Sequence, residues 1–169
     1  MEDEVHVISI LVRNRSGVLS RVAGVFGRLG YNIESLCVAV TTNPKISRIT
    51  LVSGANTDFT EKIKKQLDRL VDVIEVTELR QVQSIQREMI LLGIDITREN
   101  RKEIMQAIEM FGCKIVSIRQ DYCIIENVAN RGETQTIIKY FEPMGIEELA
   151  RTGVIALLQK KNKENNGEQ

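Results

Sequence analysis

The segment Arg13 to Glu34 carries residue types that could bind a small charged molecule. A polar turn precedes a helix expected to begin near Gly17, so the backbone N–H groups of Gly17, Val18 and Leu19 have no intrahelical acceptors. They lie at the positive end of the helix dipole, which favours a carboxylate. Because Gly17 has no side chain, a ligand can approach its backbone closely.

Two amides flank the same helix. Asn14 precedes it and Asn32, followed by Ile33, comes after it. A neutral amide can hydrogen-bond an ammonium or a carboxylate without the cost of burying another charge. These residues together predict a pocket for a free amino acid, although Asn and Gly are also ordinary turn and capping residues.

Groups for catalysis are scarce. The only histidine, His6, lies inside a run of β-branched residues, and we interpret it as structural. No Ser–His–Asp or Cys–His set can be assembled away from it. Cys37, Cys113 and Cys123 are odd in number and widely spaced, so we expect buried free thiols rather than a disulfide framework or a metal site.

The first half of the chain predicts the element order βαββαβ. Strands are expected over 5–12, 33–40, 47–52 and 71–76, and helices over 18–29 and 58–70. Asp58 begins a capping box for the second helix. This order is typical of a ferredoxin-like domain, whose two helices cover one face of the sheet. The other face and the sheet edge need cover, so we expect a dimer.

The second half predicts the same order. Strands are expected over 88–96, 115–118, 123–128 and 150–158, and helices over 104–111 and 133–141. Gly153 is expected to form a bulge in the last strand. The fold class is therefore α+β, with two tandem ferredoxin-like domains. The expected boundaries are a domain over 1–79, a polar linker over 80–87, a domain over 88–158 and a disordered tail over 159–169.

The charge balance argues against two classes of partner. The 169 residues carry 23 Lys and Arg and 23 Asp and Glu, so no net field favours nucleic acid or an anionic membrane. The acidic start, Met1 to Glu4, leads into an apolar run too short for a signal peptide or a membrane span. We expect a cytoplasmic protein.

The segment Asn14 to Leu36, NRSGVLSRVAGVFGRLGYNIESL, resembles the ACT domain of the small, regulatory subunits of acetohydroxyacid synthase, also called acetolactate synthase. The similarity continues through Ser47–Thr50 and Gln66–Val73 to Glu88. Phe141 to Gly153, FEPMGIEELARTG, resembles the C-terminal domain of that family. Nearly the whole chain is covered.

The resemblance implies a chain without catalytic residues that binds the catalytic subunit, raises its activity and confers feedback inhibition by a branched-chain amino acid, valine first. Thiamine diphosphate, Mg and FAD would belong to the catalytic subunit and none of them to this chain. In the family, two ACT domains pair side by side and the effector lies at their interface.

Carried over to this sequence, the resemblance assigns each site residue a role. The backbone of Gly17, Val18 and Leu19 would face the effector's carboxylate, Asn14 and Asn32 would orient its polar groups, and Ile33 would flank them. The charged segment Glu147 to Gly153 is the first candidate for contact with the catalytic subunit.

Two other function classes stay open. A stand-alone amino-acid-binding ACT regulator, for example of transcription, would require a basic helix-turn-helix, and neither half of the chain has the basic excess. A small enzyme on a ferredoxin-like fold is disfavoured by the single histidine.

Overall fold

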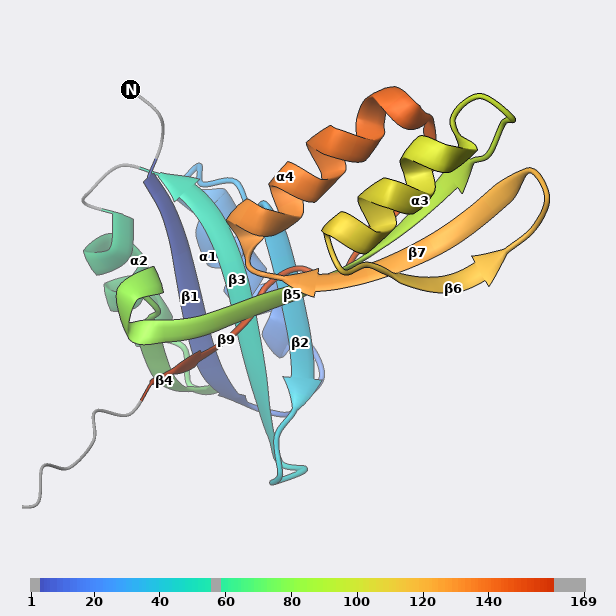
Figure 1. The fold of residues 1–169 in the computed structure, drawn as a ribbon. Helices are drawn as coiled ribbons and strands as arrows, with labels where there is room; N and C mark the ends of the chain where they lie inside the picture. The colour runs from blue at the N-terminus through green and yellow to red at the C-terminus, as the bar shows by residue number, and fades with distance from the viewer. Residues whose placement is uncertain (1–3, 56–58, 160–169) are drawn as a thin grey trace, which may run out of the picture.

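Two α+β domains follow one another along the chain (Figure 1), in a computed structural model that describes residues 4–55 and 59–159. The first contains β1 (Glu4–Arg13), α1 (Val18–Arg28), β2 (Ser35–Val40), β3 (Ile46–Ala55), α2 (Phe59–Leu67) and β4 (Val73–Glu78). After a 3₁₀ turn, η1 (Gln81–Gln83), the second contains β5 (Ser84–Asp95), α3 (Arg101–Met110), β6 (Lys114–Ile118), β7 (Tyr122–Ala129), α4 (Arg131–Phe141), η2 (Glu142–Met144), β8 (Ile146–Arg151) and β9 (Ile155–Leu158).

Both sheets have the ferredoxin-like strand order that the sequence predicts. The N-terminal sheet is ordered β2-β3-β1-β4 and the C-terminal sheet β6-β7-β5-β8, with β9 pairing β5 off this path. All strand pairs are antiparallel. Each unit is thus a split βαβ arrangement with its own core.

Strand β1 is apolar along nearly its whole length because both of its faces are covered. Ile8, Ile10 and Val12 join a core with α1 and α2. Val7 and Ser9 point the other way, since side chains alternate along a strand, and they are buried as well. A continuous β-branched run is the sequence pattern that this two-sided burial produces.

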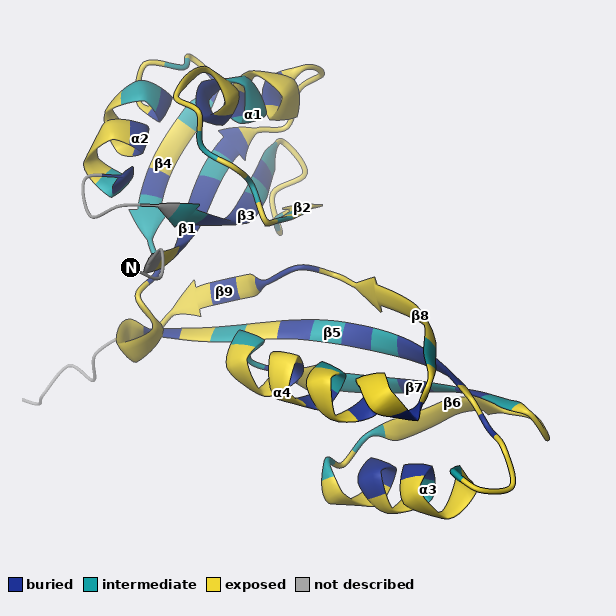
Figure 2. Cartoon of the chain, turned by 90° about the horizontal axis from the view of Figure 1, so that it is seen from above, coloured by how far each residue is buried: buried dark blue, intermediate teal, exposed yellow. Residues whose placement is uncertain are grey.

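The cover on the helix-free face of the N-terminal sheet comes from the chain's own second domain. Figure 2 shows α1 and α2 on one side of that sheet and β5 with β9 on the other. A separate buried cluster joins the domains: Val7, Val52, Leu79, Val154 and Ala156. The expectation that this face needs a second copy is therefore wrong where β9 and the start of β5 lie against it. The edge strand β2 has no neighbour on its outer side within the described chain.

The prediction of a single last strand over 150–158 was also wrong. The structure has two strands here: β8, which begins at Ile146, before the predicted start, and β9, and both pair with the long strand β5. Both strands run antiparallel to β5, so the chain keeps its direction, but the register shifts by one residue between them: Ile90 pairs with Arg151 and Arg87 with Ile155. The extra residue is Gly153, whose φ of 77° lies in the left-handed region that favours glycine, in agreement with the predicted bulge. The residues Ser84–Arg87, assigned above to the linker, belong to β5, where they pair with β9.

Some expectations fall on residues that the structure does not describe. The capping residue Asp58 and the tail from 160 to 169 both lie outside the described residues. Within the described part of the chain, no helix combines the length and hydrophobicity needed to cross a membrane.

Candidate functional site

The start of α1 has the geometry of an anion-binding turn. Gly17 is the N-cap residue, with φ 79° and ψ −3°, and no side chain caps the helix or places an acid in its first turn. Within the described residues the N–H groups of Gly17 and Leu19 have no acceptor, and that of Val18 makes only a long bond of 3.4 Å to the Arg15 carbonyl. These donors point to an open surface, because Gly17 and Leu19 are exposed.

Val18 contributes its backbone alone. Its side chain is 4% exposed and lies in the core beneath α1. Burial of this side chain anchors the first turn of the helix on the sheet. The backbone donors are therefore held in place before any ligand binds, which lowers the entropy cost of binding.

Asn14 is fixed by the turn between β2 and β3. Its Nδ2 donates to the Pro44 carbonyl at 3.0 Å and its backbone N–H donates to the Lys45 carbonyl at 2.8 Å. The Oδ1 atom has no recorded donor within the described residues, so it can accept a hydrogen bond from an ammonium group.

Asn32 and Ile33 lie at the other end of the sheet. The Asn32 carbonyl accepts a 2.6 Å hydrogen bond from the buried Ser53 hydroxyl, near the end of β3, and Ile33 packs against the core while staying partly exposed. Pro44, which holds Asn14, lies just before the start of β3. At about 3.3 Å per residue, the length of β3 between these two anchors is on the order of 20 Å.

One chain therefore does not bring the predicted site residues together. Helix α1, with 11 residues, separates Gly17 from Asn32 by about 16 Å along its axis. An amino acid spans only a fraction of that distance. The predicted site residues of one chain thus fall into two groups, one at either end of α1, which we call half-sites of the predicted effector pocket.

Sequence reasoning missed a charged group beside Gly17. The Arg21 guanidinium donates to Asp72 at 2.6 Å, and the Arg15 guanidinium lies 4.0 Å from the same carboxylate, which is 10% exposed. An Arg21 nitrogen also lies 3.1 Å from the position that a Cβ on Gly17 would take. The signal was available in the sequence, because residues four apart on a helix share a face.

The edge of the N-terminal sheet beside α1 is apolar and exposed. Strand β2 presents Leu36, Val38 and Val40, which are 36%, 42% and 60% exposed. Edge strands that stay single usually carry charges, proline or bulges, and β2 has none of these. This edge has the character of a pairing surface.

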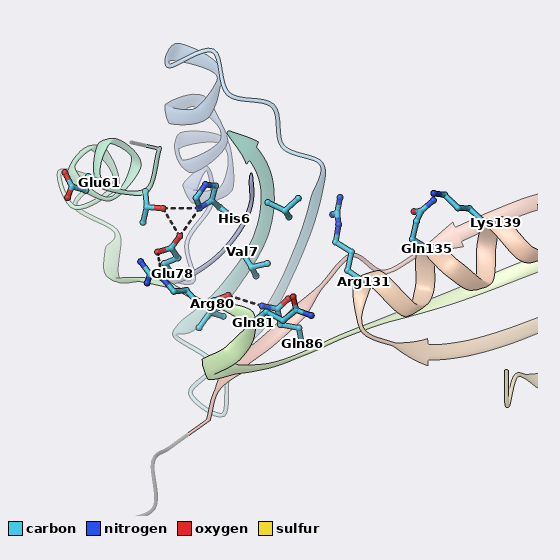
Figure 3. A pocket seen from close by; sticks show the side chains of 14 residues that line it. His6, Val7, Glu61, Glu78, Arg80, Gln81, Gln86, Arg131, Gln135 and Lys139 are labelled. Atoms are coloured by element: carbon cyan, nitrogen blue, oxygen red, sulfur yellow. Dashed lines mark hydrogen bonds and ion pairs between the residues drawn. The ribbon is translucent and has the colours of Figure 1, made fainter. Parts of the chain in front are cut away.

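A large cleft between the domains holds the only histidine (Figure 3). Its volume is about 1030 Å³, with strands β1 and β4 on one side and α4 with Arg131, Gln135 and Lys139 on the other. His6 Nδ1 lies 2.9 Å from a Glu78 carboxylate oxygen, which also accepts a 2.8 Å hydrogen bond from the Thr60 hydroxyl. The imidazole is thus part of a hydrogen-bonded polar cluster that links β1, α2 and β4.

The electrostatics of that cluster favour the carboxylate form of Glu78. Burial raises its pKa, but the hydrogen bonds from His6 and Thr60 and the charges of His6 and Arg80 outweigh burial, and the pKa is lowered below 4.5. No serine or cysteine lines the described part of the cleft. The hydroxyl in the cluster, that of Thr60, donates to Glu78, so the cluster fits a structural role.

The remaining chemistry-bearing residues do not form a second centre. Cys37, Cys113 and Cys123 are free; Cys123 is buried while the other two are partly exposed, and burial raises the pKa of the Cys113 and Cys123 thiols. Over residues 4–55 and 59–159, no group of three or more His, Cys, Asp or Glu side chains could hold a metal ion.

Comparison with known proteins decides the family. Residues 8–75 match the "AHAS small subunit-like ACT domain", and residues 87–160 match the "Small subunit of acetolactate synthase" family. A probable acetolactate synthase small subunit from Archaeoglobus fulgidus is 38% identical over 158 residues, covering 94% of this chain and 99% of that protein. This chain belongs to the acetolactate synthase small-subunit family.

Two further members of the small-subunit family support the assignment over the full length. A putative small subunit from Mycobacterium tuberculosis is 34% identical over 157 residues, covering 93% of this chain and 94% of that protein. The crystal structure of the Thermotoga maritima small subunit superimposes with a TM-score of 0.85 at 32% identity, covering 94% of this chain and 99% of that one. The ACT match of residues 8–75 includes all six predicted effector-site residues.

Proposed function

We propose that this chain is the regulatory subunit of an acetolactate synthase. It binds the catalytic subunit in the cytoplasm, raises its activity and confers feedback inhibition by a branched-chain amino acid, with valine the first candidate. Membership of the small-subunit family supports the catalytic subunit of acetolactate synthase as the partner. We assign thiamine diphosphate, Mg and FAD to the catalytic subunit and no cofactor to this chain.

The uncapped start of α1 is the observation that carries the effector site. Its free N–H donors would bind the effector's carboxylate, with the Arg21 guanidinium adding positive charge beside them. Asn14 would accept a hydrogen bond from the ammonium group. A neutral branched side chain then needs an apolar wall, which this half-site does not itself complete.

The second half-site would come from a partner copy. We propose that two chains pair through the exposed edges of β2 in antiparallel fashion, around a two-fold axis. Such pairing sets the start of one α1 towards the far end of the other. It would bring Asn32 and Ile33 of the second copy to the Asn14–Gly17 turn of the first, so the dimer would hold two shared sites.

A shared site suits feedback inhibition for a thermodynamic reason. An effector changes the activity of a distant subunit only if it binds two arrangements of the assembly with different affinity. Rotation of one chain against the other would move both walls of a shared site. A coupling of about 1–3 kcal/mol would give a 5- to 150-fold effect.

Reconstitution of the enzyme tests the proposal. Pyruvate condensation should be absent with this chain alone, and its rate with the catalytic subunit should rise when this chain is added and fall on titration with valine. Condensation by the isolated chain would contradict the proposal. Amino-acid binding without any effect on the catalytic subunit would also contradict it and would favour a stand-alone sensor.

A further inference from the structure

A second concave surface lies between the domains. Strands β5 and β9 cross the helix-free face of the N-terminal sheet in front of β1 and β3 (Figure 1), and a groove of about 370 Å³ runs beneath them. We call it the β5/β9 groove. It is lined by side chains from β2, β3, β5 and β9: Cys37, Ala39, Arg48, Thr50, Ile85, Arg87, Ile155, Ala156 and Leu157.

The groove is apolar and open, and no residue of the described stretches 4–55 and 59–159 fills it. Ile85 pairs with Leu157, and Arg87 with Ile155, so these four side chains share one face of the β5/β9 ladder. Ile85, Ile155 and Leu157 are 52%, 55% and 62% exposed. The same strand face continues to Met89, which pairs with the 58% exposed Val128 of β7. Contiguous exposed apolar surface of this kind marks an interaction site.

Two arginines supply the only charges among the described residues that line the groove. The Arg48 guanidinium donates to the Ser9 hydroxyl at 2.6 Å, and the Arg87 guanidinium donates to the Gln86 carbonyl at 2.8 Å. Neither arginine has a carboxylate partner within the described residues. The surface therefore suits an occupant that combines apolar side chains with at least one carboxylate.

This charge pattern disfavours a second copy as the occupant. A two-fold contact sets a patch against itself, so the arginines of one groove would meet those of the other. Like charges across an interface are costly. A different partner with an acidic, apolar surface segment has no such penalty.

We infer that the β5/β9 groove docks an apolar segment of the catalytic subunit that carries a carboxylate. This inference rests on the proposed function, which supplies that partner. The groove is a different surface from Glu147–Gly153, within which Arg151 and Gly153 make contacts inside the chain. Gly153 is buried beside Ser35, and the Arg151 guanidinium donates to the buried Glu88 at 2.5 Å.

The position of the groove connects it to the effector site. Cys37 and Ala39 of β2 form one wall, and β2 begins two residues after Ile33. At its other end, the turn between β2 and β3 is held by Asn14 through Pro44. The β2–β3 hairpin thus touches both half-sites and the groove. A shift of this hairpin on effector binding would change the groove wall, which gives the effector a route to the catalytic subunit.

Surface substitutions in the full-length chain test the docking site. Leu157→Asp and Arg87→Glu change exposed side chains, and each should raise the concentration needed for half-maximal activation of the catalytic subunit by at least about tenfold. Arg87→Lys should restore most of the loss. Met110→Asp is the matched control, because Met110 is 60% exposed at the end of α3, away from the groove, and it should activate like the wild type.

Three readouts make the result decisive. In Leu157→Asp and Arg87→Glu, the affinity for valine measured by calorimetry should be unchanged. Sedimentation should still show a dimer. Wild-type activation by both variants would overturn the docking site while leaving the regulatory function intact, whereas failure of the wild-type chain to activate would refute the proposed function itself. A shift from dimer to monomer in either variant would overturn the inference by assigning the groove to a second copy.

Discussion

At the residue scale, Gly17 is required for two separate reasons. Its φ of 79° is a conformation that side chains other than glycine adopt at a cost of about 1–2 kcal/mol. A Cβ at this position would also lie 3.1 Å from an Arg21 nitrogen, on the surface where the effector's carboxylate is proposed to bind. Backbone geometry and ligand access thus demand the same residue.

Gly17→Asp should abolish valine inhibition and leave activation within about twofold of the wild type. The new carboxylate would pair with Arg21 and occupy the place of the effector's carboxylate, which it also repels. Gly17→Ala is the control for strain and size, and it should retain part of the inhibition. Rates of pyruvate condensation against valine concentration measure both. Full valine sensitivity in Gly17→Asp would place the effector elsewhere.

The sequence alone predicts an uncapped helix start at Gly17, and the four-residue spacing places Arg21 beside it, but the ion pair of Arg21 with Asp72 is not predictable from the sequence. The turn chemistry of Asn14 and Gly17 is local, so the printed sequence reveals it. The pairing of Arg21 with Asp72 spans 51 residues and depends on how α1 lies over the start of β4. No local pattern encodes a contact of that range.

At the element scale, the βαββαβ order follows from alternation and helical periodicity, and the structure confirms it in both domains. The end of the second domain was predicted only in part, because β8 (IEELAR) is charged and exposed and does not show the pattern of a half-buried strand. The division into β8 and β9 depends on β5, which at 12 residues is long enough to pair with both. Strand length and partner choice are tertiary properties.

Gly153→Ala tests this division. The φ of 77° disfavours alanine, and the added Cβ would lie 3.3 Å from the Ser35 Cβ at the start of β2. We expect a loss of about 1–2 kcal/mol in the free energy of unfolding, measured by denaturant titration. Gly27→Ala is the matched control, because a Cβ there meets open space within α1, and it should leave stability unchanged or raise it. Equal stability of the Gly153→Ala chain and the wild type would contradict a requirement for glycine at this bulge.

The polar cluster joining β1, α2 and β4 predicts a pH dependence of stability. Because the pKa of Glu78 is lowered in the folded state, the unfolded chain binds more protons as the pH falls below 4.5. The carboxylate's contribution is therefore complete above pH 4.5 and is lost as the pH falls through the folded-state pKa.

Glu78→Gln should accordingly lower the free energy of unfolding by about 1 kcal/mol at pH 7, and the difference from wild type should shrink below pH 4.5. Denaturant titrations across this range measure it. Glu75→Gln, an exposed change on the same strand, should show little effect at any pH. A constant difference between Glu78→Gln and the wild type from pH 7 to pH 3 would contradict the assignment.

At the scale of the whole molecule, the sequence predicts two tandem domains but not how they pack. The helix-free face of the N-terminal sheet was expected to meet another chain, yet Val7 and Val52 pack against Val154 and Ala156 of the same chain. An apolar sheet face must be buried, but its sequence does not specify whether the covering residues come from the same chain or from another. The separation of Asn32 from Gly17, by contrast, already follows from the length of the helix predicted over 18–29.

The most direct test of the shared effector site uses two inactive variants in one dimer. Gly17→Asp damages the first half-site and Asn32→Ala the second, so each homodimer should fail to bind valine in calorimetric titration. In a heterodimer purified through two different affinity tags, one site combines both damaged halves and the other combines both intact halves. The account predicts that this heterodimer binds valine at a single site with wild-type affinity, whereas a heterodimer that binds no valine would show that each site lies within one chain.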